Sequence, residues 1–263
     1  MKLHTKYLTR LLTITFFCAS LCLLPQSANL AVKPSAMTPA NNVAMMFESH
    51  IRTIYNNMDL ANKGLNYNTF KYALIGYYNI NPDRDFLTGR TKIAICDFRQ
   101  PSSQKRLFVI DLASQSLLFH TYVAHGKNSG LVYAQTFSNA PSSLQSSLGF
   151  YRTEDVYYGS NGYSLRLEGL DRGFNDRAKE RAIVMHGAAY VDEGYIQKTG
   201  KAGRSWGCPA VPLELCHDII DQLRWGNYVF VYTDDANYLN NSTYINLHKA
   251  ATAYAKKEGL SIN

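Results

Sequence analysis

The stretch RLFVIDLASQSLLFHTYVAHG, residues 106–126, holds two runs rich in Val, Ile, Leu and Phe on either side of a polar break. Runs of this composition, bounded by small polar residues, are typical of β-strands. Ser114 and Gln115 stand at the break, where the chain would reverse. The stretch therefore predicts a β-hairpin.

Similar runs surround this hairpin. They are KIAICDF before it and LGFYRTEDVYY, YSLRLEGL, RAIVMHGAAY and NYVFVYT after it, bounded by Gly, Ser or Asn residues. One later segment, PLELCHDIIDQLRW, predicts a helix, because Pro212 suits a first helical turn and Gly226 suits the position past a helix end. We therefore expect a mostly β domain over residues 89–235 with one late helix.

The residues before this domain have a helical period. Residues 43–88 are expected to form an α-helical N-terminal extension, and residues 236–263 a polar C-terminal tail that ends in a short helix, NLHKAATAYAKKEG. The apolar residues that recur at the spacing of one helix face are Met46, Ile51, Ile54, Met58, Phe70, Leu74 and Tyr77.

The first 28 residues have the composition of an export signal. MKLHTKYLTR is cationic, and LLTITFFCASLCLLP is apolar but short for a bilayer-spanning helix. We expect cleavage near Ala28, a linker over residues 29–42, and export to the periplasm or cell envelope. An uncleaved signal would instead leave the protein associated with the inner membrane.

The composition also excludes several classes of protein. Hydrophobic residues make up 46% and charged residues 18%, which excludes global disorder. The net charge is +7, and Lys2, Lys6 and Arg10 of the expected signal account for three of these charges, so the mature chain is only mildly basic. No basic stripe with interleaved aromatic residues occurs, and we therefore expect no nucleic-acid partner. Neither an HExxH motif nor paired CxxC spacing is present, so we expect no metal.

Three cysteines remain after the signal: Cys96, Cys208 and Cys216. An odd number leaves at least one thiol unpaired in an oxidising compartment. The sequence leaves two alternatives for Cys96 and Cys216: they form a disulfide with each other, or both are buried reduced thiols. Cys208 lies between a glycine and a proline in GRSWGCPAVP, residues 203–212, which suits a reactive thiol on a rigid loop and equally a structural turn.

A nucleophilic cysteine needs a base, a group that orients the base, and donors for the oxyanion. His125 and His186 are the candidate bases, because each ends an expected strand and precedes a glycine. The residues alone do not choose between them. The helix expected close behind Cys208 would favour the thiolate, so we expect an exposed thiol of low pKa.

The segments VMHG and SWGCP, with 22 residues from His186 to Cys208, resemble the L,D-transpeptidase catalytic (YkuD-like) family. The family pattern is a strand-end His-Gly, a variable loop, and then Ser/Thr-x-Gly-Cys. The hairpin over residues 106–126 resembles the family's opening hairpin, and SSLGFYRT resembles its Thr-Pro-x-Gly-x-Phe segment. The resemblance covers residues 91–233 and implies a β-sandwich or barrel-like catalytic domain.

The same resemblance implies a role for each residue of the site. Cys208 is expected to be the nucleophile, His186 the base, and the carbonyl of Gly187 the group that orients this base. Gly207 belongs to the cysteine loop, whose backbone N–H groups are the expected oxyanion donors. The residues expected to line the substrate pocket are Ser205, Arg204, His125 and Gly126.

The implied reaction is acyl transfer on peptidoglycan stem peptides, without a cofactor. Cys208 would attack the carbonyl before the terminal D-residue of a tetrapeptide, expel D-alanine and form a thioester. A neighbouring stem, water, a protein lysine or a D-amino acid would then accept the acyl group. Ala210 stands where the family commonly has arginine or asparagine, and the loop before Cys208 is long, which leaves donor and acceptor specificity open.

Two alternatives accompany this interpretation. The first is an L,D-carboxypeptidase or murein-trimming cysteine hydrolase of the same fold. The second is a non-catalytic murein-binding domain, against which the presence of both Cys208 and His186 argues.

Overall fold

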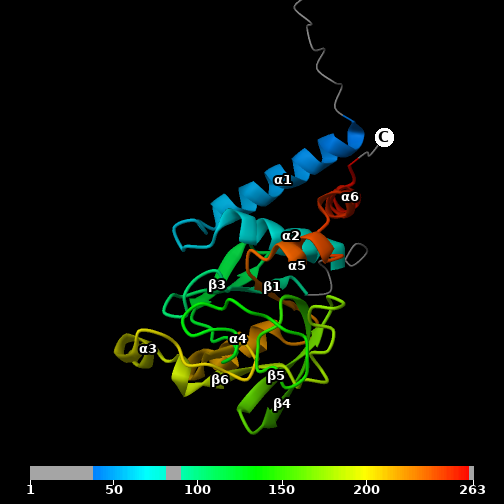
Figure 1. Ribbon diagram of the computed structural model, residues 1–263. Helices are drawn as coiled ribbons and strands as arrows, with labels where there is room; N and C mark the ends of the chain where they lie inside the picture. The colour runs from blue at the N-terminus through cyan, green and yellow to red at the C-terminus, as the bar shows by residue number, and fades with distance from the viewer. Residues whose placement is uncertain (1–37, 81–89, 261–263) are drawn as a thin grey trace, which may run out of the picture. The chain divides into compact units, whose positions relative to one another are not determined.

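The computed structural model describes residues 38–80 and 90–260. The predicted signal over residues 1–28 and most of the predicted linker lie outside the described residues. The described part is built around one mixed β-sheet with helices packed against it (Figure 1). No helix within it is both long enough and apolar enough to cross a membrane.

The described residues form an eight-stranded sheet in the order β3-β2-β1-β8-β4-β5-β6-β7. Strand β1 runs parallel to β8, and β6 runs parallel to β7, whereas the other neighbours are antiparallel. The strands are β1 (Lys92–Asp97), β2 (Leu107–Asp111), β3 (Ser116–Thr121), β4 (Gly149–Gly159), β5 (Gly162–Gly169), β6 (Val184–Ala188), β7 (Ala210–Pro212) and β8 (Tyr228–Tyr232).

The predicted strands and the predicted hairpin are confirmed. The turn between β2 and β3 contains Ser114 and Gln115, and Gln115 has a φ of 49°, in the left-handed region. Strand β7 was not predicted, because it has only three residues and follows the sequence Gly-Cys-Pro.

The two edges of the sheet meet, so the sheet is nearly closed into a barrel. Just beyond β3, the backbone N–H of Ala124 donates to the carbonyl of Ala210 in β7 at 2.8 Å. A second bridge joins Gly126 to Ser205. This closure places the segment after β3 beside the residues that lead into Cys208. The mostly β, barrel-like fold class is thereby confirmed.

Three helices form a cap over one side of the sheet. They are α1 (Pro39–Asn57), α2 (Tyr67–Ile80) and α6 (Leu247–Lys257), which pack against one another at the top of Figure 1, and α2 also contacts β1 and β8. Thr38 caps α1 by accepting a hydrogen bond from the backbone N–H of Asn41 at 3.3 Å. Gly76 of α2 lies against the ring of Phe150, so closely that a Cβ there would be 1.9 Å from it.

The N-terminal helices were predicted, but one residue of the predicted apolar face was wrong. Met46 is 46% exposed, whereas its neighbour Phe47 is fully buried together with Ile51. One residue corresponds to about 100° around a helix, so the buried face includes Phe47 and excludes Met46. Helix α1 also begins at Pro39, within the range predicted as linker.

The residues predicted as a polar tail contribute to the same helical layer. The predicted short helix is confirmed as α6, which has four buried alanines and packs against α1 and α2. Helix α5 (Ala236–Asn241) buries Tyr238, whose hydroxyl donates to the carboxylate of Asp171 at 3.2 Å. The C-terminal residues are therefore tied both to the cap and to the loop after β5.

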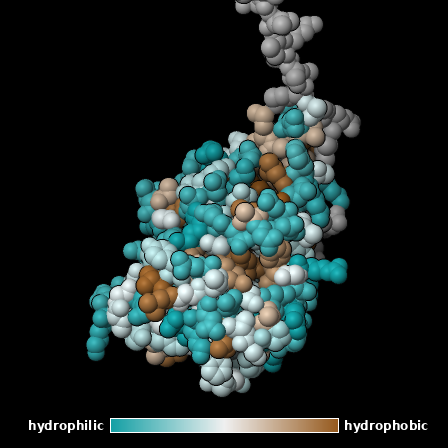
Figure 2. All heavy atoms as spheres, viewed as in Figure 1, coloured by the Kyte–Doolittle hydropathy of each residue, from teal (hydrophilic) through white to brown (hydrophobic). Residues whose placement is uncertain are grey.

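The predicted late helix is α4 (Cys216–Leu223), which packs against β1, β5 and β6. Its buried face consists of Cys216, Ile219, Ile220 and Leu223. A short helix, α3 (Glu193–Thr199), projects beyond β6. Hydrophilic side chains cover most of the face seen in Figure 2, with isolated hydrophobic spots.

Candidate active site

A cavity of about 450 Å³ gathers side chains from segments that are far apart in the sequence. It contains four of the predicted site residues, including both the predicted nucleophile and the predicted base. Its lining residues are Ser160, Asn161, Arg181, Ala182, His186, Tyr190, Arg204, Ser205, Trp206 and Cys208.

His186 is the central residue of β6, between Ser164 of β5 and Ala210 of β7. Its Nδ1 lies 3.0 Å from the carbonyl oxygen of Gly187. A carbonyl only accepts hydrogen bonds, so Nδ1 carries the proton and Nε2 keeps a lone pair. Burial lowers the pKa of His186 below its ordinary value of 6.5, although the bond to Gly187 opposes this shift. At neutral pH the ring is therefore neutral and can accept a proton at Nε2.

Gly187 holds this part of β6 against α4. A Cβ at Gly187 would lie 2.9 Å from the Cβ of Cys216 and 3.1 Å from its Sγ. Only glycine allows so close an approach, which fixes the carbonyl that orients His186.

Ser205 shapes the loop that carries Cys208. Its hydroxyl donates to the carbonyl of Cys208 at 2.6 Å and accepts from the backbone N–H of Gly207 at 3.1 Å. Gly207 has a φ of 126°, a conformation that favours glycine. The backbone N–H of Ser205 in turn donates to the carbonyl of His125 at 3.0 Å. The N–H of Gly207 is thus engaged within the turn rather than free for an oxyanion.

The sulfur of Cys208 has two backbone partners. It accepts from the N–H of Val184 at 3.5 Å, and its S–H donates to the carbonyl of Ala182 at 3.8 Å. Burial raises the pKa of the Cys208 thiol above its ordinary value, while the N–H of Val184 and the charge of Arg181 oppose that rise. The thiol is therefore protonated at neutral pH and needs a base when it attacks.

The prediction of an exposed thiol of low pKa is wrong for two reasons. The side chain of Cys208 is half-buried, and strand β7 separates it along the chain from α4, which begins only at Cys216. In the described part of the chain, no hydrogen bond joins this sulfur to His186. Such bonds commonly tighten only when a substrate is bound.

His125 does not line the cavity, so that prediction is wrong. The ring is fully buried, its Nδ1 accepts from Nη2 of Arg106 at 2.7 Å, and its Nε2 lies 3.2 Å from the carbonyl oxygen of Gly130. Burial and the charge of Arg106 lower the pKa of His125 to about 4. With both ring nitrogens bonded inside the protein, His125 supports the seam, which is the place where residues 124–126 meet Ser205 and Ala210. His186 is the histidine that lines the cavity together with Cys208.

Gly126 also supports the seam instead of lining the pocket. Its N–H donates to the hydroxyl of Ser146 at 3.0 Å, and a Cβ there would lie 2.6 Å from the carbonyl oxygen of Leu144. The hydroxyl of Ser146 donates to the carbonyl of Gly207 at 3.3 Å. The segment after β3 is thereby connected to the cysteine loop.

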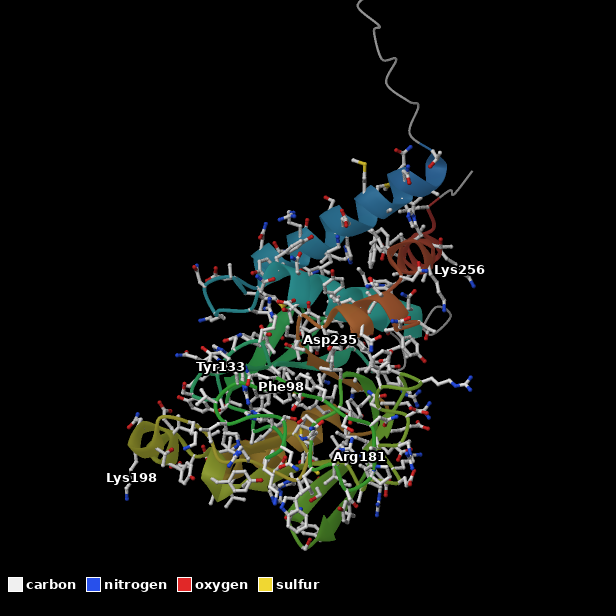
Figure 3. All side chains as sticks on the ribbon, in the orientation of Figure 1. Phe98, Tyr133, Arg181, Lys198, Asp235 and Lys256 are labelled. Atoms are coloured by element: carbon white, nitrogen blue, oxygen red, sulfur yellow. The ribbon has the colours of Figure 1, made fainter. Side chains whose placement is uncertain are left out.

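Sequence reasoning missed six residues of the cavity, which are Ser160, Asn161, Arg181, Ala182, Tyr190 and Trp206. Arg181 stood at the start of a run predicted as a strand, but β6 begins only at Val184 and Ala182 has a φ of 51°. Trp206 is 74% exposed at the cavity, and its only signal was an aromatic residue within a glycine-flanked loop. Figure 3 shows Arg181 at the end of the molecule away from Lys256 of α6.

The other two cysteines of the described residues, Cys96 and Cys216, are buried free thiols. Burial raises the pKa of Cys96 to about 12 and that of Cys216 to about 11, so neither is activated for attack. Within residues 38–80 and 90–260, no three His, Cys, Asp or Glu side chains lie close enough together to hold a metal ion.

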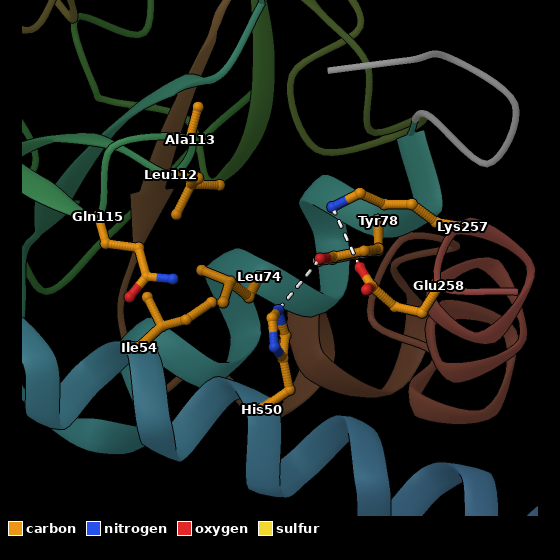
Figure 4. A pocket seen from close by; sticks show the side chains of 9 residues that line it. All are labelled: His50, Ile54, Leu74, Tyr78, Leu112, Ala113, Gln115, Lys257 and Glu258. Carbon is orange, nitrogen blue, oxygen red and sulfur yellow. Dashed lines mark hydrogen bonds and ion pairs between the residues drawn. The ribbon is translucent and has the colours of Figure 1, made fainter. Parts of the chain in front are cut away.

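A second cavity, of about 360 Å³, lies between the cap and the turn after β2 (Figure 4). Nε2 of His50 lies 3.3 Å from the hydroxyl of Tyr78 there, and Gln115, Lys257 and Glu258 complete the polar lining. This cavity contains no cysteine or serine nucleophile. The cavity at Cys208 is therefore the candidate active site.

A comparison with known families identifies the chain. The sequence model of the L,D-transpeptidase catalytic domain matches residues 61–232. The chain belongs to this family. The match includes both His186 and Cys208, and it also extends into α2 of the cap. No curated protein matches the chain.

Several solved L,D-transpeptidases are similar to part of the chain. One from Mycobacterium smegmatis is 12% identical, with 54% of this chain and 59% of that one covered and a TM-score of 0.34. One from Mycobacterium tuberculosis is 14% identical, with 54% and 58% covered and a TM-score of 0.33. A further one, solved in complex with imipenem, is 12% identical, with 54% and 59% covered and a TM-score of 0.34.

The chain spans somewhat over half the length of these structures. At identities and TM-scores this low, membership of the family rests on the sequence match alone.

Proposed function

We propose that this member of the L,D-transpeptidase family is an exported cysteine acyltransferase that acts on peptidoglycan stem peptides. One observation carries the proposal: Cys208 and His186 line the same cavity, and the carbonyl of Gly187 holds His186 with Nε2 free to accept a proton. The cationic, apolar N-terminal composition supports export.

The first half of the reaction forms an acyl-enzyme. Nε2 of His186 takes the proton of the Cys208 thiol as the sulfur attacks the carbonyl that precedes the terminal D-residue of a tetrapeptide. The carbonyl becomes a tetrahedral oxyanion. Its C–N bond then breaks, His186 returns the proton to the leaving amine, and D-alanine departs from a thioester on Cys208.

The second half transfers the acyl group. An amine from a neighbouring stem gives a proton to His186, attacks the thioester carbonyl and expels the Cys208 sulfur, which regains its proton. The product is a direct cross-link between two third-position residues. When water takes the place of the amine, the same steps give an L,D-carboxypeptidase, which is the second candidate.

The purified protein incubated with murein that bears tetrapeptide stems tests the proposal. Cross-linked dimers support a transpeptidase, tripeptides without dimers support the hydrolytic candidate, and no change with an intact fold contradicts both. Cys208→Ala is the matched control and should give no product. Because a strained β-lactam carbonyl mimics the acyl donor, a carbapenem should acylate Cys208 and add its mass to the protein.

A further inference from the structure

The cavity around Cys208 contains fixed positive charge and no acidic side chain. Arg181 and Arg204 both line it. Apart from His186, the serine, asparagine and tyrosine side chains that also line it are neutral. In the part of the chain that the structure describes, no carboxylate lies within ion-pair distance of either guanidinium. Arg181 is half-buried, and a half-buried charge without a counterion inside the protein is uncommon, because desolvation makes it costly.

Arg181 is held rigidly by neutral acceptors. Nη1 donates to the carbonyl of Ser138 at 2.7 Å and to the hydroxyl of Ser147, and Nη2 donates to the hydroxyl of Ser143 at 3.1 Å and to the carbonyl of Gln145 at 2.6 Å. These bonds fix the guanidinium without cancelling its charge.

The fixed guanidinium lies close to the cysteine loop. Nη2 of Arg181 is 3.2 Å from the position that a Cβ on Gly207 would occupy, one residue before Cys208. Burial raises the pKa of the Cys208 thiol, and the charge of Arg181 opposes part of this rise. Arg181 therefore places a fixed positive charge beside the nucleophile.

Arg204 stands on the cysteine loop itself and is exposed. Only Nη1 is bonded, to the carbonyl of Lys127 at 2.9 Å and to that of Gly130 at 3.3 Å. These two bonds anchor the side chain across the seam. Nη2 and Nε have no hydrogen-bond partner among the described residues, so they are available to an acceptor that enters the cavity.

We propose that this pair of arginines forms a carboxylate site, which selects acyl donors that carry a free carboxylate next to the bond that is broken. Arg204 binds the carboxylate through Nη2 and Nε, the paired geometry in which a guanidinium meets a carboxylate. Arg181 is a positioning residue that supplies charge and fixes residues 138–147. That the carboxylate belongs to the terminal residue of a stem peptide rests on the proposed function.

The geometry of a peptide donor agrees with this site. In a donor whose last residue is released, the terminal carboxylate is separated from the attacked carbonyl by only one residue. A site for this group must therefore lie close to the sulfur, and Arg181 and Arg204 line the same cavity as Cys208. A donor with a C-terminal amide of the same size is neutral there and would leave the guanidinium charge without a counterion. We therefore expect the site to discriminate against the amide.

The charge of the site can be measured without any turnover. Iodoacetate and iodoacetamide alkylate the same thiolate and differ chiefly in charge, so the ratio of their rates at Cys208 reports the local field and is independent of the thiol pKa. Relative to a neutral thiol such as 2-mercaptoethanol, the ratio of iodoacetate to iodoacetamide rates should be raised. Each unit charge within about 4 Å contributes roughly fivefold in water.

Four variants and one control complete this test. Arg204→Gln and Arg181→Gln should each lower the ratio several-fold, whereas Arg204→Lys and Arg181→Lys should keep most of it. Arg177→Gln is the control, because Arg177 is exposed in the same loop and already paired with Glu180 at 2.8 Å. Thermal melting confirms the fold of each variant, and peptide mapping confirms that Cys208 carries the label. An unraised wild-type ratio, or one that no Gln variant lowers, overturns the site.

Paired donors then identify the ligand. A tetrapeptide with a free terminal carboxylate should be used with at least roughly tenfold higher kcat/KM than its C-terminal amide, and Arg204→Gln should lose this preference mainly through KM. Equal use of both donors contradicts the inference and leaves the proposed function intact. A raised alkylation ratio with neither donor used keeps the anion site and contradicts the proposed function.

Discussion

Acidification should destabilise the protein through His125, which is buried at the seam of the sheet. The pKa of this histidine is about 4 in the folded protein, because burial and the neighbouring Arg106 disfavour its charged form, and Arg204 adds a smaller effect. In the unfolded chain its pKa returns to the ordinary 6.5. Between these two values the unfolded state binds a proton that the folded state does not, so the free energy of unfolding falls as the pH falls.

The magnitude follows from the shift. Each pH unit contributes about 1.4 kcal/mol, so the loss from His125 amounts to about 2 kcal/mol between pH 7 and pH 5 and about 3 kcal/mol when titration is complete. His125→Gln removes this titration. The variant should be less stable than the wild type at pH 7, because it loses bonds to Arg106 and Gly130, but its stability should decline less on acidification.

Urea unfolding at half-unit steps from pH 7 to pH 5 measures both curves. Other histidines whose pKa is lowered by burial, such as His50 and His186, are present in both proteins and cancel in the difference. The difference in unfolding free energy between wild type and variant should shrink by about 2 kcal/mol over this range. His125→Asn, which keeps an acceptor near Arg106, provides a second variant. Parallel curves for both variants would refute the account of His125.

Three further predictions concern the site itself. His186→Ala should lower kcat roughly 100- to 10,000-fold with the fold intact, as steady-state kinetics and circular dichroism would show; a loss below tenfold would exclude His186 as the base. Gly187→Ala should lower the unfolding free energy by roughly 1–3 kcal/mol, because its Cβ would lie 2.9 Å from that of Cys216; an unchanged melting temperature would contradict this packing. Iodoacetamide should label Cys208 well before Cys96 or Cys216, and mass spectrometry that finds either buried thiol labelled first would contradict the burial described.

The strands were predictable because their apolar runs are long and end in turn residues. Strand β7 was not, since its three residues are defined by pairing with β6 and with Ala124, which lies far away in the sequence. The cap was predictable as helices from apolar spacing. Spacing alone did not determine which of two neighbouring residues is buried. Met46 was expected on the buried face, but Phe47 is the buried residue.

The candidate site was predictable only where a motif carries it. The family pattern connected His186 with Cys208, and the structure places both on one cavity. His125 has the same local context as His186, but closure of the sheet buries it beside Arg106, a pairing that no local pattern reveals. The position of Arg181 depends on a loop of several turns before β6, so its place beside the cysteine loop also required the three-dimensional structure.

The most direct test of the central claim is the mass of the protein during turnover. The enzyme is mixed with a tetrapeptide donor, quenched in acid within seconds, and analysed by intact-protein mass spectrometry followed by peptide mapping. The account predicts an adduct equal to the donor minus D-alanine, on the peptide that contains Cys208, and no adduct in Cys208→Ala. Two results would contradict the account. One is product formation by the wild type, and likewise by His186→Ala, without this adduct, and the other is product formation by Cys208→Ala.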